Sequence, residues 1–168
     1  MKIKHSFLTC ILILAVVLFT GCSAVTHEVA KDGDTVYVHY TGTLSDGSVF
    51  DSSVGGDPLV FVLGEGKMIT GFENAVRGMK VGETKTITLS PAEAYGEYRE
   101  DLVTVFPKSE IPEDITVEIG MVLSLQSSSG DIFYATVIAI GEDTITLDAN
   151  YELAGKELTF EIELVKIE

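Results

Sequence analysis

One stretch of the chain, LGEGKMITGFENAVRGMKVGE (residues 63–83), contains the signals for a short helix. Thr70 and Glu73 have the S/T-x-x-E spacing of a capping box, which satisfies free backbone N–H groups where a helix begins. Gly78 follows as a stop signal. The apolar residues between these signals recur at helical spacing: Phe72, Ala75, Val76 and Met79. The sequence therefore predicts one helix of about two turns from Thr70.

Segments on both sides of this helix alternate between apolar and polar residues, as half-buried strands do. In DTVYVHYTGTL (34–44), Val36, Val38 and Tyr40 share one face. Three further segments read as strands: LVFVLG (59–64), ETKTITLSP (83–91) and ELTFEIELVKIE (157–168). Several such strands and a single helix predict an α+β domain, in which an antiparallel sheet packs on the helix.

A second group of strand signals lies between Tyr98 and Tyr151. Turn-like residues separate three runs, MVLSLQ (121–126), IFYATVIAIG (132–141) and DTITLD (143–148). Linked hairpins of this kind form a small, partly independent sheet. Some of its apolar residues must form a core, and a unit this small leaves others exposed. The candidates are Val122, Leu123, Leu125, Ile132, Phe133, Val137 and Ile138.

The first 22 residues, MKIKHSFLTCILILAVVLFTGC, have the layout of a signal peptide. Two lysines precede an apolar run that is shorter than the roughly 20 residues of a membrane span. The sequence LFTGC (18–22) resembles a lipobox, at which cleavage leaves a lipid-modified Cys22. We therefore expect a signal peptide at 1–21 and a lipidated tether at 22–33. The protein would be held on the cell membrane, facing outside the cytoplasm. An uncleaved anchor and an ordinary secreted protein are the alternatives.

Composition excludes several classes of chemistry. Cys10 lies in the signal segment and Cys22 carries the expected lipid, so the sequence predicts no disulfide and no thiol nucleophile. His5, His27 and His39 lack metal-ligand spacing, so we expect no metal site and no cofactor. The net charge of −15 repels nucleic acid. The glycines of residues 63–83 lack the Gly-Lys-Ser/Thr ending of a phosphate loop, which argues against a nucleotide site.

Aromatic residues stand at strand ends and in a loop, SPAEAYGEY (90–98), where Tyr95 and Tyr98 flank a glycine. Aromatic rings in a loop either pack back on a core or contact a ligand. Taken alone, the rings of the chain could simply form a core.

Four blocks together resemble an FKBP-type peptidyl-prolyl isomerase: VHYTGTLSDGSVFDSS, LGEGKMITGFENAVRGMKVGE, SPAEAYG and LTFEIELVKIE. The resemblance implies a bent antiparallel sheet around one short helix, formed by residues 34–100 and 149–168. About 50 residues separate SPAEAYG from the last strand. The segment 101–148 is similar to the insert-in-flap domain of the SlyD-type subgroup, which binds unfolded chains. The His-rich metal-binding tail of that subgroup has no counterpart, so nickel handling is not implied.

The resemblance also implies the site. The catalytic residues would be Tyr95, whose hydroxyl donates to a substrate carbonyl, and Asp51, which orients a polar group or interacts with the twisted carbonyl. Tyr98 would pack where the insert begins. The residues implied in substrate binding are Tyr40, Phe50, Leu59, Phe61, Met68, Ile69, Phe72 and Phe160.

These expectations describe a monomeric rotamase and chaperone that acts on unfolded or proline-containing polypeptides. A membrane-anchored binding module without catalysis is the main alternative. A structural β-rich surface lipoprotein is another. If Tyr40, Asp51, Phe72 and Tyr95 surround one cavity, the structural reading loses support.

Overall fold

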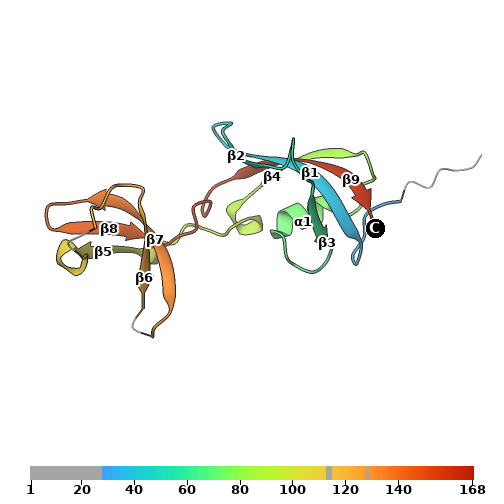
Figure 1. Ribbon diagram of the computed structural model, residues 1–168. Helices are drawn as coiled ribbons and strands as arrows, with labels where there is room; N and C mark the ends of the chain where they lie inside the picture. Colours follow the sequence, from blue (N-terminus) through green and yellow to red (C-terminus); the bar gives the residue numbers. More distant parts are fainter. Residues whose placement is uncertain (1–27, 113–114, 128) are drawn as a thin grey trace, which may run out of the picture.

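The computed structural model describes residues 28–112, 115–127 and 129–168. The chain forms two antiparallel sheets that lie at opposite ends of the molecule (Figure 1). The predicted signal peptide, Cys22 and most of the predicted tether lie outside the described residues. No helix within the described part is long and apolar enough to cross a membrane.

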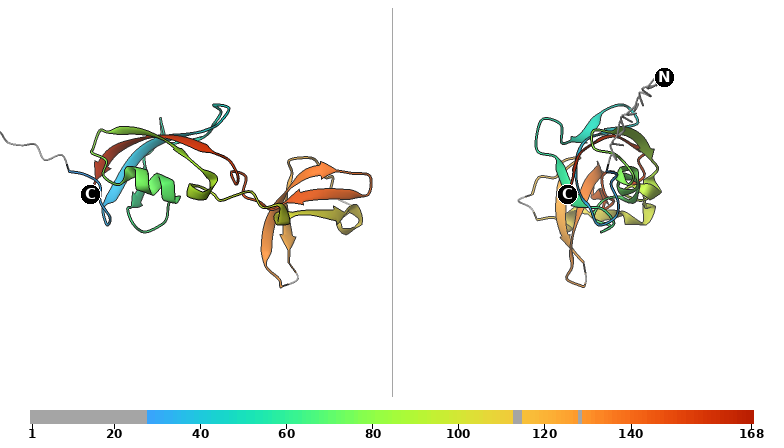
Figure 2. Two further views of the ribbon diagram at one scale, coloured as in Figure 1. Left: turned by 180° about the vertical axis from the view of Figure 1, so that it is seen from behind. Right: turned by 90° about the vertical axis from the view of Figure 1, so that its right-hand side faces the viewer.

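The larger sheet has five strands and one short helix packed against it. Its path runs β2 (Val49–Ser52), β1 (Thr35–Leu44), β9 (Leu158–Ile167) and β4 (Thr84–Leu89), and β3 (Leu59–Val62) also pairs with β1. All of these pairings are antiparallel. The helix α1 (Thr70–Val76) lies under the curved sheet (Figure 2). The predicted α+β class, with an antiparallel sheet around one helix, is confirmed.

The core of this lobe lies between the concave face of the sheet and α1. The inward positions predicted from alternation are buried on β1, where Val36 and Val38 have no exposed surface. The apolar side of α1 also faces this core, and every second residue of β9 points into it. The buried residues from these two elements are Phe72, Ala75, Val76, Leu158, Phe160, Ile162 and Leu164. Burial of these side chains is the main force that holds the helix on the sheet.

The helix begins at Thr70 as predicted, but the predicted capping box is wrong. Ile69 is the N-cap residue, and its side chain makes no capping hydrogen bond. The Glu73 side chain is buried instead, and its carboxylate accepts a hydrogen bond from the backbone N–H of Gly64. Glu73 therefore ties the loop before α1 to the helix. This loop carries Met68 and Ile69.

The lobe begins before the predicted boundary at residue 34. Val29 forms an isolated antiparallel bridge with Lys80, and Ala30 is 2% exposed. The Ala30 N–H donates to the carbonyl of Met79 at 2.8 Å, and the Gly78 N–H donates to the carbonyl of Ala30 at 2.7 Å. These hydrogen bonds and the burial of Ala30 hold this end of the predicted tether on the lobe.

The smaller sheet occupies residues 103–148, within the segment predicted as the insert. Its order is β5 (Val103–Pro107), β8 (Thr144–Asp148), β7 (Ile132–Ile140) and β6 (Val122–Gln126). The sequence analysis did not predict β5, a five-residue strand that ends in a proline. The sheet has its own core of Ala135, Val137, Ile145 and Leu147.

Of the apolar residues predicted to divide between core and surface here, only one is fully buried. Val137 is in the core, and Leu123 and Leu125 pack partly against it. The exposed members are Val122, Ile132, Phe133 and Ile138. This sheet therefore keeps substantial apolar surface in contact with solvent.

Two chain crossings join the lobes, and we call residues 96–102 and 148–155 the junction. A short 3₁₀ turn, Glu100–Leu102, lies within the junction. Two others lie outside it: Pro91–Glu93 precedes the junction, and Lys108–Glu110 follows β5. The Asn150 side chain joins the crossings, because it accepts from the Arg99 N–H and donates to the Arg99 carbonyl, both at 2.9 Å. The Gly155 N–H also donates to the carbonyl of Gly96 at 2.8 Å.

Candidate active site

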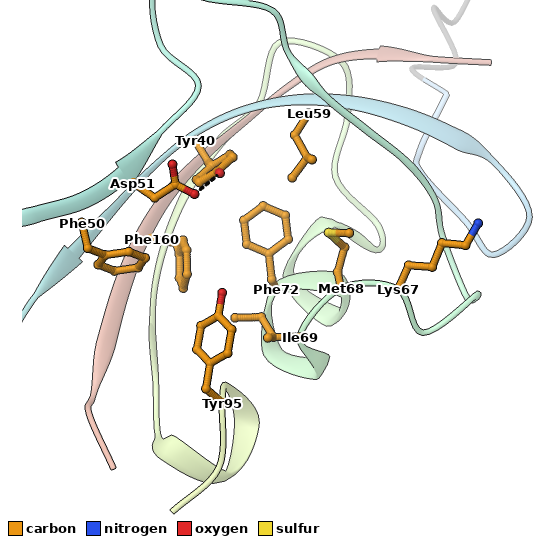
Figure 3. Close-up of a pocket in the computed structure, with 10 residues that line it drawn as sticks. All are labelled: Tyr40, Phe50, Asp51, Leu59, Lys67, Met68, Ile69, Phe72, Tyr95 and Phe160. Atoms are coloured by element: carbon orange, nitrogen blue, oxygen red, sulfur yellow. Dashed lines mark hydrogen bonds between the residues drawn. The ribbon is translucent and has the colours of Figure 1, made fainter. Parts of the chain in front are cut away.

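One cavity of about 260 Å³ opens between the sheet, the start of α1 and the loop after β4 (Figure 3). Its lining is mainly aromatic and aliphatic, with a few polar groups. It consists of Tyr40, Phe50, Asp51, Leu59, Lys67, Met68, Ile69, Phe72, Tyr95 and Phe160. The structure thus brings together nine of the ten predicted site residues.

Phe72, at the start of α1, forms the centre of the ring cluster. Its ring centroid lies 5.7 Å from that of Tyr40 and 5.4 Å from that of Phe160, both edge to face. Phe50, on β2, meets Phe160 in the same way at 5.7 Å. Edge-to-face contacts of this kind hold rings at defined angles. The cavity therefore has a rigid apolar floor.

Phe61 does not line this cavity. It is 5% exposed, and its ring packs behind Phe72 at a centroid distance of 6.1 Å. Leu59 and Phe61 point to the same face of β3, but the rise along a strand separates them by about 6.6 Å. Leu59 therefore reaches the cavity, whereas Phe61 supports its floor from within the core.

Asp51 and Tyr40 form the main polar contact of the cavity wall. The Tyr40 hydroxyl donates to Oδ2 of Asp51 at 2.5 Å. Burial, followed by the hydrogen bond and the charge of Asp51, raises the pKa of Tyr40 to about 12. The hydroxyl therefore stays protonated near neutral pH, and its donated bond holds the carboxylate in place.

Tyr95 reaches the cavity from the loop after the first 3₁₀ turn. Its side chain extends toward Ile69 and Phe160, with the hydroxyl directed into the cavity (Figure 3). The next residue, Gly96, has φ +88°, a region that L side chains rarely adopt, so the chain can turn away at once. Partial burial, followed by the electrostatic interaction with Tyr151 and the charge of Asp51, raises the pKa of Tyr95. A protonated donor therefore stands at the mouth of an apolar hollow.

Residues 26–165 match the sequence profile of one protein family, FKBP-type peptidyl-prolyl cis-trans isomerase. The chain belongs to this family. The match covers both lobes, and it confirms the predicted enzyme class.

Relatives in this family support the same reading. The chain is 39% identical over 149 residues to a short-type peptidyl-prolyl cis-trans isomerase of Methanocaldococcus jannaschii, covering 80% of this chain and 91% of that protein. It is 32% identical to an FKBP-type 16 kDa peptidyl-prolyl cis-trans isomerase of Escherichia coli, covering 84% and 95%. It is 34% identical to the isomerase SlyD of Vibrio cholerae, covering 76% and 63%.

In this FKBP-type site, sequence reasoning missed Lys67, which stands at the rim. Its ammonium pairs with Glu65 at 2.7 Å and is largely exposed to solvent. Lys67 immediately precedes the predicted pair Met68 and Ile69. Its position next to Met68 on the same loop could have predicted that Lys67 lines the cavity.

Tyr151 was also missed, because it lies far from Tyr95 in the sequence. The two rings are stacked, with centroids 4.6 Å apart and planes at 20°. Beside them a second hollow of about 220 Å³ adjoins the ring-lined cavity, since both are lined by Phe50, Asp51 and Tyr95. No pattern in the sequence pairs these tyrosines.

Tyr98 lies in the junction and does not line the pocket. Its hydroxyl donates to Oδ2 of Asp148 at 2.9 Å, which connects the two crossings. A Cβ atom at Gly155 would lie 2.7 Å from the Cβ of Tyr98, so the backbones approach closely here. The predicted packing of Tyr98 where the insert begins agrees with these contacts.

Proposed function

We propose that the ring-lined cavity binds the prolyl residue of a polypeptide and accelerates rotation about the preceding peptide bond. The observation that carries the proposal is the ring-lined apolar cavity with Tyr95 at its mouth and the bonded Tyr40–Asp51 pair on its wall. Unfolded or proline-containing chains are the proposed substrates. Because the cavity is complete within one chain, we propose that the protein acts as a monomer.

The chemistry requires no covalent intermediate. Rotation about an X–Pro bond crosses a barrier of roughly 20 kcal/mol, because the twisted amide loses its resonance. A twisted amide is less polar than a planar one, so an apolar cavity favours it over the planar ground state. Such differential binding lowers the barrier. The rings around Phe72 would provide this environment.

Two polar groups have separate roles in this mechanism. The Tyr95 hydroxyl would donate to a substrate carbonyl that flanks the proline, and so hold the chain while the bond turns. Asp51 would act mainly by orienting Tyr40, since its Oδ2 already accepts the Tyr40 hydroxyl. This favours the orienting role for Asp51 over direct contact with the twisted carbonyl.

We also propose that the smaller lobe is an insert-in-flap domain that holds unfolded chains, as in the SlyD-like subgroup. Its support is the exposed apolar side chains that surround a core of only four buried residues. Val105, Ile119, Val122 and Ile132 are each 59% or more exposed. A hollow of about 440 Å³ lies among Ile111, Pro112, Ile115, Val117 and Ile140. Unfolded segments held there would raise the local concentration of prolines near the pocket.

The proposed place of action is the outer side of the cell membrane, reached through a cleaved signal and a lipid on Cys22. This part of the proposal depends on the sequence LFTGC (18–22). Lipid chains on Cys22 would hold the protein at the surface with the catalytic lobe next to the anchor.

Replacing Cys22 by Ser tests the anchor. We expect the unchanged protein in the membrane fraction and the Cys22→Ser protein in the soluble fraction, because the thiol is the lipid attachment point. Metabolic labelling with a radioactive fatty acid is the direct measurement, and Cys10→Ser is the matched control. Equal labelling of the Cys22→Ser protein would contradict the lipid assignment.

The isomerase proposal is tested on the soluble chain that begins at Ser23. A protease-free assay follows the cis-to-trans relaxation of a proline-containing tetrapeptide. We expect a rate that rises in proportion to enzyme concentration. A rate equal to the uncatalysed relaxation, with peptide binding retained, would favour the binding-module alternative.

A further inference from the structure

Tyr95 is held less firmly than the other rings of the isomerase pocket. Phe72 is 3% exposed and Phe160 is 4% exposed, whereas Tyr95 is 37% exposed. Tyr95 also lies outside regular secondary structure, in the loop that Gly96 closes through a 2.8 Å hydrogen bond to the carbonyl of Pro91. A partly exposed side chain in a loop samples several rotamers unless a neighbour restricts it.

The neighbour that restricts it is Tyr151. The two rings lie nearly parallel, at 20°, with centroids 4.6 Å apart. Among the described aromatic pairs this is the stacked one, while the rings of the pocket floor meet edge to face or tilted. A ring stacked on Tyr95 limits rotation about its side-chain bonds and so fixes the direction of its hydroxyl.

Tyr151 is itself anchored by the junction. The preceding residue, Asn150, makes two hydrogen bonds of 2.9 Å to the backbone of Arg99 and one of 2.7 Å to Asp148. The carbonyl of Tyr151 accepts the Ala154 N–H at 2.9 Å, and Ala154 is buried. Tyr151 thus reaches Tyr95 from a braced segment that is distant in sequence.

We propose that Tyr151 is a positioning residue for the isomerase reaction, which holds the Tyr95 hydroxyl over the pocket. The inference rests on the proposed function and deepens it. Because Tyr151 lies three residues after the end of β8, in the junction, the stack also connects the smaller lobe to the catalytic one. Tyr151 touches Tyr95 and lines the adjoining hollow, but it does not line the pocket that holds the proline.

This placement predicts which kinetic parameter changes. The apolar contacts that set KM come from the residues that line the pocket, and Tyr151 is not one of them. Loss of the stack would leave the proline bound but the donor misdirected in the transition state. We therefore expect Tyr151→Ala to lower kcat by a few-fold at most, which is the loss expected when the Tyr95 hydroxyl itself is removed, with KM nearly unchanged. Tyr151→Phe keeps the ring and should restore most of the rate.

The experiment uses the soluble chain Ser23–Glu168 with a tetrapeptide substrate, so that binding by the smaller lobe does not enter. Tyr134→Ala is the matched control, since Tyr134 is a 67% exposed tyrosine on β7. A double-mutant cycle joins Tyr151→Ala with Tyr95→Phe. If Tyr151 acts through the Tyr95 hydroxyl, Tyr151→Ala has no further effect once that hydroxyl is gone.

Two results would overturn the proposal. One is a Tyr151→Ala protein as active as Tyr134→Ala. The other is an equal loss of kcat in the presence and absence of the Tyr95 hydroxyl, which would mark a general structural effect.

NMR of ¹³C-labelled tyrosine rings gives a readout that does not depend on activity. Tyr151→Ala should shift the Tyr95 ring resonances and broaden or average them, whereas Tyr134→Ala should leave them in place. Unchanged Tyr95 resonances would contradict the stack even if kcat fell. If the unsubstituted chain has no isomerase activity but Tyr151→Ala still shifts the Tyr95 resonances, the proposed function is wrong. The stack between Tyr95 and Tyr151 is then still supported.

Discussion

The Tyr95 hydroxyl is the donor that the proposed mechanism requires at the mouth of the pocket. It lies opposite the Tyr40–Asp51 pair, which is already satisfied by its own 2.5 Å hydrogen bond. Tyr40 has little capacity left to hold a substrate carbonyl, because its one proton is committed to Asp51. The hydrogen bond to the substrate carbonyl in the transition state therefore comes from Tyr95.

Replacing Tyr95 by Phe should lower kcat/KM by a few-fold, about what loss of one neutral hydrogen bond costs. Tyr98→Phe is the matched control, since the Tyr98 hydroxyl bonds Asp148 outside the pocket. A protease-free isomerisation assay measures both variants. Equal effects would show that the assignment of Tyr95 is wrong.

At the scale of elements, the pocket wall depends on how closely β1 and β2 approach. Gly42 on β1 lies under the ring of Phe50, and a Cβ atom there would lie 2.5 Å from Cζ of that ring. The ring of Phe50 in turn meets Phe160 edge to face. Glycine at position 42 thus lets an aromatic side chain from β2 lie flat across β1 and form the wall.

Gly42→Ala should displace the Phe50 ring and destabilise the fold by about 1–3 kcal/mol, the usual cost of overpacking. KM for a tetrapeptide should rise because the wall moves. Urea unfolding and steady-state kinetics measure the two effects. In a Phe50→Leu background the same substitution should cost clearly less. Strict additivity would mean that the clash is not the cause.

The loop before α1 depends on the buried carboxylate of Glu73. Because this carboxylate accepts the Gly64 N–H, Glu73→Ala would leave a backbone donor without its partner. We expect a loss of about 1–3 kcal/mol in the free energy of unfolding, measured in urea. Glu73→Gln keeps an acceptor and should cost less. Equal losses would indicate that packing volume, and not the hydrogen bond, stabilises this loop.

At the scale of the whole molecule, two lobes with separate cores meet through the junction. Asn150 and Arg99 bring the chain crossings side by side, so residues 100 and 149 can be joined directly. The catalytic lobe keeps all residues of the pocket when the smaller lobe is removed. Tyr151 also remains in the shortened chain.

Deleting residues 101–148 should leave tetrapeptide turnover largely intact and impair proline-limited refolding of a whole protein. The reason is that a tetrapeptide needs only the pocket, whereas an unfolded chain also contacts the exposed apolar surface of the smaller lobe. Isomerisation and refolding rates are measured side by side, with the full chain Ser23–Glu168 as reference. Equal loss on both substrates would argue against a division of labour.

The sequence by itself determined the strands with strict alternation, the helix from Thr70, and the residues that approach the pocket. These features are local: period, β-branched content and family motifs act within a few residues. The same local reasoning failed for the Thr70–Glu73 capping box. It failed because the Glu73 carboxylate accepts the N–H of Gly64 in the preceding loop. The capping-box rule considers only residues three apart, so it cannot predict this contact.

Only the tertiary structure decided the remaining features. Phe61 does not line the pocket, because it lies two residues beyond Leu59 on β3 and is buried in the core there. The short strand β5 exists because β8 pairs with it. Tyr151 stacks on Tyr95 because the junction brings together two segments that are far apart along the chain. Contacts of this kind depend on closing long loops, and their cost and geometry are set by the whole fold.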